Sequence, residues 1–246
     1  MIGKIEKLLK MDDYDLEAVF TPAIVNMLIL DIVFTRTLLP IAENTSWWRP
    51  VLAIAAPLAA AVVLTRFVMH IFRGVSRMFF EDILYRKDRL LFPTTSMLLL
   101  GDNRTSVSKM MKNRVRENLK TLYNITLPTK AKEDADEMEA RRTAKDAVYY
   151  IRKAVADSGD TITRRKLKRY GMFRNFLGGA VICLPLSVAC WFIDLSRTGV
   201  SISIIHIALI LYLILVVIDF FITKSAAVDY AETLITTFDK LNHDEA

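Results

Sequence analysis

Four long apolar runs alternate with polar segments along this chain, covering residues 20–42, 48–71, 172–193 and 200–223. A helix rises about 1.5 Å per residue, so about 20 apolar residues cross a bilayer core about 30 Å thick. Lipid offers backbone amides no hydrogen-bond partner, so each run is expected to be helical. The pattern predicts an all-α integral membrane protein with four transmembrane helices.

The polar stretches between these runs divide the chain into five parts. The predicted parts are an N-terminal amphipathic helix (1–19), a first transmembrane hairpin (20–72), a cytosolic helical module (73–171), a second transmembrane hairpin (172–224) and a C-terminal tail (225–246). The first part either lies on the inner leaflet or packs on the module. Thr21 followed by Pro22 is typical of a helix start, which we expect for the first span.

Within the module, apolar residues recur at steps of three and four over 106–124, which predicts an amphipathic helix. A second helix is predicted over 130–156, acidic at its start and basic later, in the order that the helix dipole favours. Between the second span and these helices, Pro93 and the turn residues at 101–103 predict a loop that carries a short helix.

Charge is distributed unevenly and predicts the orientation. The chain has 33 Lys and Arg against 27 Asp and Glu, and residues 73–174 hold 24 of the basic and 13 of the acidic ones, a local net of +11. The short segments 44–49 and 194–199 carry one basic residue each. Because basic loops stay on the cytoplasmic side, we expect both termini and the module in the cytoplasm of a bacterium, with the spans in its inner membrane.

The basic residues that flank the module suggest an anion site at the membrane face, since the forked donors of arginine suit phosphate. The candidate ligand-binding residues are Arg86, Lys87, Arg89, Arg104, Arg164, Arg165, Lys166, Lys168, Arg169 and Arg174. A nucleotide or an anionic lipid head group is the expected ligand. For the cluster before the third span, the favoured interpretation is a belt of cations attracted to anionic lipid without a defined site, and the anion site is the functional alternative. Interleaved acids and the absence of a binding motif argue against nucleic acid.

Polar residues inside the predicted spans are costly and so are candidates for function. They are Asn26, Asp31, Arg36 and His206. Steps of five residues point the first three in different directions, which fits helix pairing better than a single pore-lining stripe, although conduction or gating stays open. Alanines of the second span and Gly178 and Gly179 in the third allow close helix approach, so we expect a homo-oligomer.

Motifs of the common enzyme classes are missing. The chain has no Walker loop, GxGxxG, HExxH or GxSxG sequence, and its two cysteines and three histidines form no cluster. We therefore expect no enzymatic activity, no cofactor and no metal site.

Two stretches, Leu91-Leu-Phe-Pro-Thr-Thr-Ser-Met-Leu-Leu100 and Tyr170-Gly-Met-Phe-Arg-Asn-Phe-Leu-Gly-Gly179, resemble a poorly characterised group of bacterial membrane proteins. The resemblance implies two spans, a cytosolic helical insert and two more spans. The layout is more loosely similar to four-span effectors of bacterial nucleotide-signalling defence, in which a cytosolic sensor drives membrane disruption.

Three functions follow from these patterns. In the first, the module senses an anionic ligand or a protein partner and changes the packing of the spans, in the extreme form as a pore-forming effector. The second is a passive membrane scaffold that recruits a soluble partner through helix 130–156. The third is a small transporter or channel, which requires Asp31.

Overall fold

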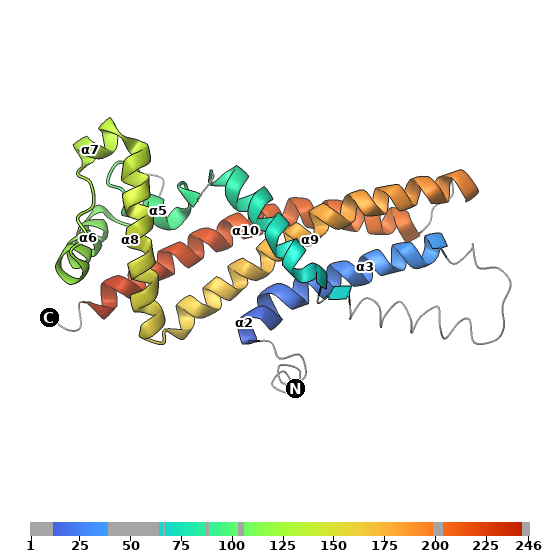
Figure 1. The fold of residues 1–246 in the computed structure, drawn as a ribbon, viewed down its shortest axis with the longest axis horizontal. Helices are drawn as coiled ribbons and strands as arrows, with labels where there is room; N and C mark the ends of the chain where they lie inside the picture. Colours follow the sequence, from blue (N-terminus) through green and yellow to red (C-terminus); the bar gives the residue numbers. More distant parts are fainter. Residues whose placement is uncertain are drawn as a thin grey trace. The chain divides into compact units, whose positions relative to one another are not determined.

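The computed structural model describes residues 12–38, 64–65, 67–86, 89–102, 106–198 and 204–242. Within these ranges the regular structure is helical throughout, which confirms the all-α prediction there (Figure 1). The chain divides into two compact units. Unit 1 comprises Met1–Met78 and Gly171–Ile222, and unit 2 comprises Phe79–Tyr170 and Thr223–Ala246.

Unit 1 begins with three consecutive helical segments, α2 (Asp13–Asp15), the π-helical η1 (Leu16–Phe20) and α3 (Thr21–Leu38). The helix therefore starts at Asp13 and not at Thr21 as expected. Asp12 caps it by accepting a 2.6 Å hydrogen bond from the Asp15 N–H. The π-helical turn ends two residues before Pro22, which has no backbone N–H to donate to the preceding turn.

The other helices of unit 1 are residues 67–76, the second part of α9 (Thr161–Thr198) and the first part of α10 (Ile204–Leu241). Their shared core is apolar and includes Val19, Phe72, Ala180, Cys183 and Tyr212. Small residues let two of the helices meet closely, because a Cβ at Gly178 would lie 2.4 Å from the Cβ of Ser76.

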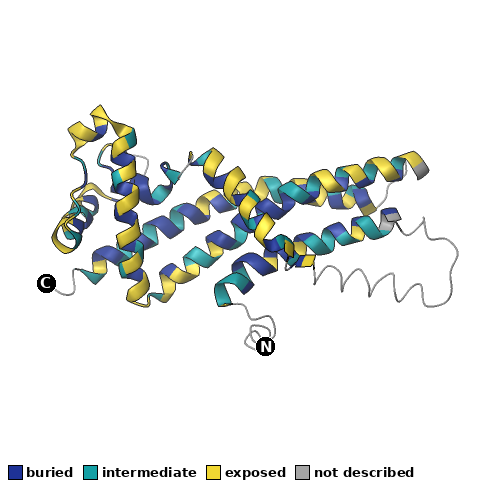
Figure 2. Ribbon diagram, viewed as in Figure 1, coloured by how far each residue is buried: buried dark blue, intermediate teal, exposed yellow. Residues whose placement is uncertain are grey.

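Three helices are long and apolar enough to cross a membrane: Asp13–Thr35, Thr161–Ser196 and Ile204–Leu241. The first, third and fourth predicted spans fall on them. The second predicted span, 48–71, lies outside the described residues except for 64–65 and 67–71, which are helical. Large apolar side chains point outward along α10, among them Ile207 and Phe221 at 63% and 66% exposure, as a lipid-facing surface requires (Figure 2).

Unit 2 contains η3 (Arg77–Asp82) from Phe79 onward, α5 (Pro93–Leu98), α6 (Lys109–Tyr123), α7 (Lys130–Ala135) and α8 (Glu137–Asp157). The first part of α9 and the second part of α10 complete it. Its buried apolar residues recur at helical spacing and include Val115, Leu119, Ala147, Ile151, Leu234 and Phe238.

The module helices follow the predicted pattern with one difference. Helix 106–124 corresponds to α6, and Pro93 starts the short helix α5 in the predicted loop. The predicted helix 130–156 is interrupted at Asp136, which leaves helical geometry (φ −143°, ψ 87°) and caps α8 by accepting from the Glu139 N–H at 3.0 Å. Aspartate competes for backbone donors in this way, which explains the break.

Candidate functional site

The basic residues proposed as an anion site make different contacts among the described residues. Arg86 is exposed and contacts the sulfur of Met138 at 3.3 Å, and Arg174 is buried in unit 1. The basic cluster at the start of α9 includes exposed and half-buried members: Arg164, Arg165, Lys166, Lys168 and Arg169. Of these, Lys166 pairs with Asp229 at 3.4 Å. Lys87 and Arg104 lie outside the described residues.

Arg89 instead lines a hollow of about 640 Å³ in unit 2, between α8 and the segment around α5. We call it the α8 hollow. Its lining includes three cations and two carboxylates, together with two threonines and two aromatic rings; the members are Asp82, Arg89, Phe92, Thr94, Thr95, Lys145, Asp146, Val148, Tyr149 and Arg152. Cavities of this size hold small organic ligands. Its three cations can donate hydrogen bonds to an anionic occupant.

Arg89 is held in place by a buried acid. Its guanidinium lies 2.5 Å from Glu81, which is 1% exposed and also accepts a 2.8 Å hydrogen bond from the Tyr170 hydroxyl. Arg89 adopts left-handed backbone geometry with φ 59°, an uncommon conformation for a residue with a side chain. Glu81 therefore fixes the Arg89 side chain and partly neutralises its charge.

Arg152 brings an unsatisfied donor to the same hollow. Its guanidinium carbon lies 5.9 Å from the ring centroid of Tyr230 on α10, within the range of a cation–π contact. Its Nε atom is buried and finds no hydrogen-bond partner among the described residues. A buried donor without an acceptor is unfavourable, so an anion that reaches it gains the hydrogen bond that the chain leaves unmade.

Lys145 and Arg152 are the residues that the sequence-based site missed. They are seven positions apart on α8 with Tyr149 between them, so all three share one helix face. This spacing was visible in the sequence. Arg89 joins them through the tertiary packing of the α5 segment, which spacing does not reveal.

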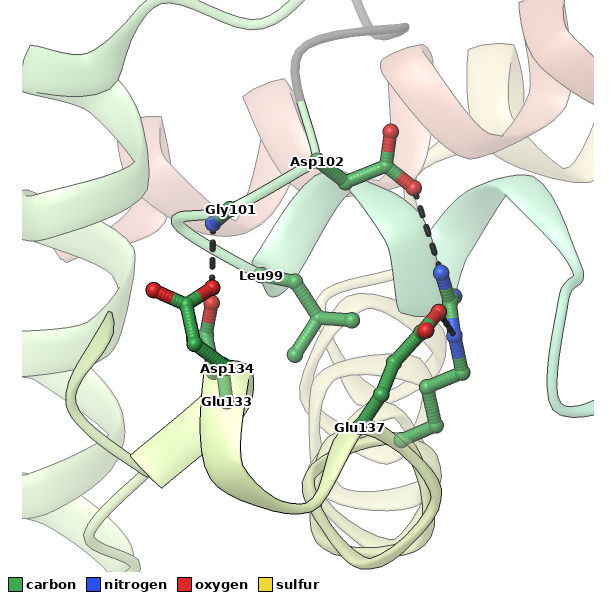
Figure 3. A pocket seen from close by; sticks show the side chains of 7 residues that line it. Leu99, Gly101, Asp102, Glu133, Asp134 and Glu137 are labelled. Carbon is green, nitrogen blue, oxygen red and sulfur yellow. Dashed lines mark hydrogen bonds and ion pairs between the residues drawn. The ribbon is translucent and has the colours of Figure 1, made fainter. Parts of the chain in front are cut away.

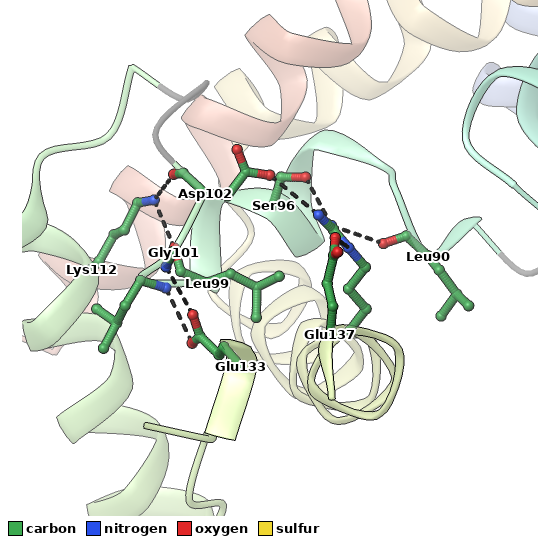
Figure 4. A network of polar contacts seen from close by, with 10 residues as sticks. Leu90, Ser96, Leu99, Gly101, Asp102, Lys112, Glu133 and Glu137 are labelled. Carbon is green, nitrogen blue, oxygen red and sulfur yellow. Dashed lines mark hydrogen bonds and ion pairs between the residues drawn. The ribbon is translucent and has the colours of Figure 1, made fainter. Parts of the chain in front are cut away.

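A second polar cluster surrounds residues 98–102 (Figure 4). Arg141 is 2% exposed and donates to Asp102 at 3.5 Å and to Glu137 at 2.8 Å. Lys112 donates to the backbone carbonyls of Leu99 and Asp102 at 2.8 and 2.7 Å. Burial lowers the pKa of Lys112, while the charges of Asp102 and Glu133 oppose that shift.

Glu133 closes this cluster from the α7 side. It accepts hydrogen bonds from the N–H groups of Leu100 and Gly101 at 3.1 and 2.8 Å, and Arg116 pairs with it at 3.1 Å. The adjoining hollow, about 420 Å³, is lined by several of the same acids (Figure 3). No group of His, Cys, Asp and Glu suited to a metal occurs in the described ranges. The charged side chains of this cluster hydrogen-bond to the backbone of residues 99–102 and so hold that segment in place.

Two of the polar residues in the predicted spans, Asn26 and His206, lie at helix contacts of unit 1. The Asn26 side-chain amide donates to the carbonyls of Pro22 and Phe176 at 2.9 and 3.4 Å, and the Asn26 backbone carbonyl accepts from the Tyr212 hydroxyl at 2.7 Å. His206 accepts from the indole N–H of Trp191 at 3.0 Å. Asp31 is half-buried, and the Arg36 side chain lies outside the description. Asn26 and His206 thus connect neighbouring helices.

Compared with known proteins, the chain matches no protein-family model, no curated protein and no solved structure.

Proposed function

We propose that this chain is a multi-span membrane protein whose unit 2 senses a small phosphate-bearing anion in the α8 hollow. The observation that carries the proposal is the hollow itself, where Arg89, Lys145 and Arg152 converge and Arg152 has a buried donor to offer. Guanidinium and ammonium groups beside threonine hydroxyls are suited to phosphate oxygens.

The connection to the membrane runs through two long helices. α9 and α10 have 38 residues each, about 57 Å, and each contributes residues to both units. A bilayer core accounts for about 20 of those residues, so each helix continues well beyond it. Arg152 packs on Tyr230 of α10. An anion that draws the Arg152 guanidinium into the hollow therefore changes a contact of α10.

The expected output is a change in helix packing that makes the membrane permeable, without enzymatic chemistry. Inorganic pyrophosphate is a suitable probe, since it carries two phosphates. We expect it to bind the detergent-solubilised protein in calorimetry and to release dye from liposomes that contain the protein. Arg152→Gln should weaken both effects about tenfold, the value of one lost charge-assisted hydrogen bond.

Arg142→Gln is the matched control, because Arg142 is exposed on the same helix and lies outside the α8 hollow. Equal pyrophosphate binding by the Arg152→Gln and Arg142→Gln variants contradicts the anion site. Binding without dye release, in cells as well as in liposomes, keeps the site and removes the permeabilising output.

A scaffold role is the second candidate, and exposed aromatic residues favour it. Tyr149 and Tyr150 on α8 are 65% and 38% exposed, and Tyr150 lies 5.4 Å from the Tyr123 ring. Aromatic residues are enriched at protein interfaces. A stoichiometric partner captured by the wild-type chain and by Asp31→Asn, but lost on Tyr150→Ser, supports the scaffold. Loss of solute uptake on Asp31→Asn points to the transporter instead.

A further inference from the structure

A second, smaller hollow of about 240 Å³ lies in unit 2 beside α10 and carries an inference that goes beyond the proposed anion sensor. We call it the α10 hollow. Its wall is mostly apolar and includes Leu84, Leu91, Met97 and Val228, while Tyr85 and Lys224 supply donors.

Tyr85 leaves a hydrogen bond unmade in this wall. The residue is 6% exposed, and its ring is fixed by edge-to-face contacts with Phe80 and Phe92 at centroid distances of 5.6 and 5.1 Å. Its hydroxyl is buried and has no hydrogen-bond partner in the described part of the chain. Burial, and then the charge of Glu81, raise the pKa of Tyr85, so it remains a neutral donor. A buried hydroxyl without an acceptor costs free energy, which an oxygen-bearing ligand in the hollow removes.

Lys224 places the hollow near the lipid head groups. It directly follows the last residue of the predicted span 200–223, and its side chain is exposed. Cations at this depth attract anionic lipid. The one carboxylate of the lining, Asp102, is already engaged by Arg141 at 3.5 Å, so it does not cancel the Lys224 charge.

The segment that carries Tyr85 also exposes apolar side chains. Phe79 and Ile83 are 44% and 70% exposed, and they precede Tyr85 by six and two residues. Exposed large apolar residues beside a mostly apolar hollow fit contact with acyl chains better than contact with water. A soluble anion gains nothing from this surface.

We infer that the α10 hollow binds an anionic phospholipid of the adjoining leaflet, with a head-group phosphate oxygen between the Tyr85 hydroxyl and the Lys224 ammonium and the glycerol region against the apolar wall.

The test compares the protein in nanodiscs of pure phosphatidylcholine and in nanodiscs with phosphatidylglycerol, and counts the phosphatidylglycerol that stays bound after purification from mixed micelles. We expect phosphatidylglycerol to raise the thermal midpoint of the wild-type chain. Tyr85→Phe should reduce lipid retention about tenfold, since it removes one hydrogen bond to a charged group. Lys224→Gln should act in the same direction, and Lys240→Gln, an exposed lysine later on α10, should not.

The Tyr85→Phe variant also shows whether phosphatidylglycerol occupies the α10 hollow. In phosphatidylcholine it should be at least as stable as the wild type, because an unpartnered hydroxyl is gone, and only in phosphatidylglycerol should it be less stable. Equal responses of both proteins to phosphatidylglycerol overturn the inference. So does an equal rise in midpoint when soluble glycerol phosphate is added to phosphatidylcholine discs, because the lipid source is then unnecessary.

Discussion

Arg141 is a cation on α8 at 2% exposure, and its role follows from what it neutralises. It holds Asp102, whose side chain is 4% exposed, at 3.5 Å. Removing one member of a buried ion pair leaves the other charge without compensation, at a cost of about 3–5 kcal/mol. We expect Arg141→Met to lower the free energy of unfolding of unit 2 by about that amount, as measured by urea titration in mild detergent.

The neighbouring arginine provides the control. Arg142 pairs with Glu139 at 3.2 Å, and both side chains are 63% exposed. Surface pairs of this kind contribute about 0–1 kcal/mol, so Arg142→Met should change little. Similar losses in the two variants would show that the buried cluster does not hold residues 98–102.

Asp160 caps α9, since its carboxylate accepts a 2.7 Å hydrogen bond from the Thr163 N–H. Replacement of a capping aspartate by alanine costs about 1 kcal/mol, and asparagine keeps most of the cap. We expect Asp160→Ala to lower the free energy of unfolding by about that amount and Asp160→Asn to stay close to the wild type.

This cap also has a pH dependence. Hydrogen bonding by Thr163, from its side chain and then its backbone N–H, lowers the pKa of Asp160 below the ordinary 3.8. The folded state therefore favours the carboxylate. The contribution of the ionised Asp160 to the free energy of unfolding is complete above pH 3.8, and it is lost as the pH falls through the lower pKa of the folded state. The difference in the free energy of unfolding between the wild type and Asp160→Ala should become smaller in that acid range. If this difference stays constant down to pH 2, the charge of Asp160 does not contribute to the cap.

Single residues of the candidate site were only partly predictable. Arg89 belonged to the proposed basic set because it is one of the basic residues that flank the module, and it does line a hollow. Lys145 and Arg152 share a helix face at seven-residue spacing, but exposed basic residues at that spacing are common on soluble helices. Only the packing of α5 and its flanks against α8 distinguishes this face, and that contact is not local in sequence.

At the scale of elements, α9 and helix 67–76 approach each other closely. A Cβ at Gly178 would lie 2.5 Å from the carbonyl oxygen of Phe72, so any side chain forces the two backbones apart. Overpacking of this kind costs about 1–3 kcal/mol. We expect Gly178→Ala to lower the thermal midpoint in detergent micelles.

Gly74 offers the matched substitution on the other helix. A Cβ there has nothing within 4 Å, and alanine is favoured over glycine in a helix by up to about 1 kcal/mol. Gly74→Ala should therefore leave the midpoint unchanged or raise it. If both alanines change the thermal midpoint equally, the close contact at Gly178 does not limit the packing of these two helices.

The ends of helices were less predictable than their existence. Thr21 and Pro22 carry the signals of a helix start, yet a π-helical turn continues the helix back to Asp13. Asp136 carries no stronger signal than the acids around it, yet it alone breaks the predicted helix 130–156. Both outcomes depend on which local hydrogen bond the fold selects, and several candidates compete at each position.

For the whole molecule, hydrophobic run length predicts most of the architecture. Because a bilayer sets a minimum length, three of the runs coincide with helices long and apolar enough to cross it. The same reasoning does not reveal that α9 and α10 continue beyond their apolar parts into unit 2. The polar residues 161–171 and 224–241 continue these helices without an interruption. Their sequence does not show whether a helix ends at the membrane surface or extends beyond it.

The orientation of the whole chain remains a prediction from charge. We expect the module inside the cell and segments 44–49 and 194–199 outside, because 24 of the 33 basic residues lie in 73–174. In a background with Cys183→Ala and Cys190→Ala, the single substitutions Thr45→Cys, Thr129→Cys and Ser196→Cys report the two sides. A membrane-impermeant maleimide added to intact spheroplasts should label the first and third variants but not the second.

Lysis of the spheroplasts is the control, since it should allow labelling of Thr129→Cys on the exposed linker before α7. Thr45 and Ser196 belong to different hairpins, so labelling of both but not of Thr129→Cys requires an odd number of crossings between each of them and the module. Labelling of Ser196→Cys but not Thr45→Cys would leave three crossings, place the N-terminal segment outside and separate the termini by the membrane. Labelling of Thr129→Cys in intact spheroplasts would place the module, and with it the α8 hollow, outside the cell. A cytosolic phosphate ligand would then be excluded.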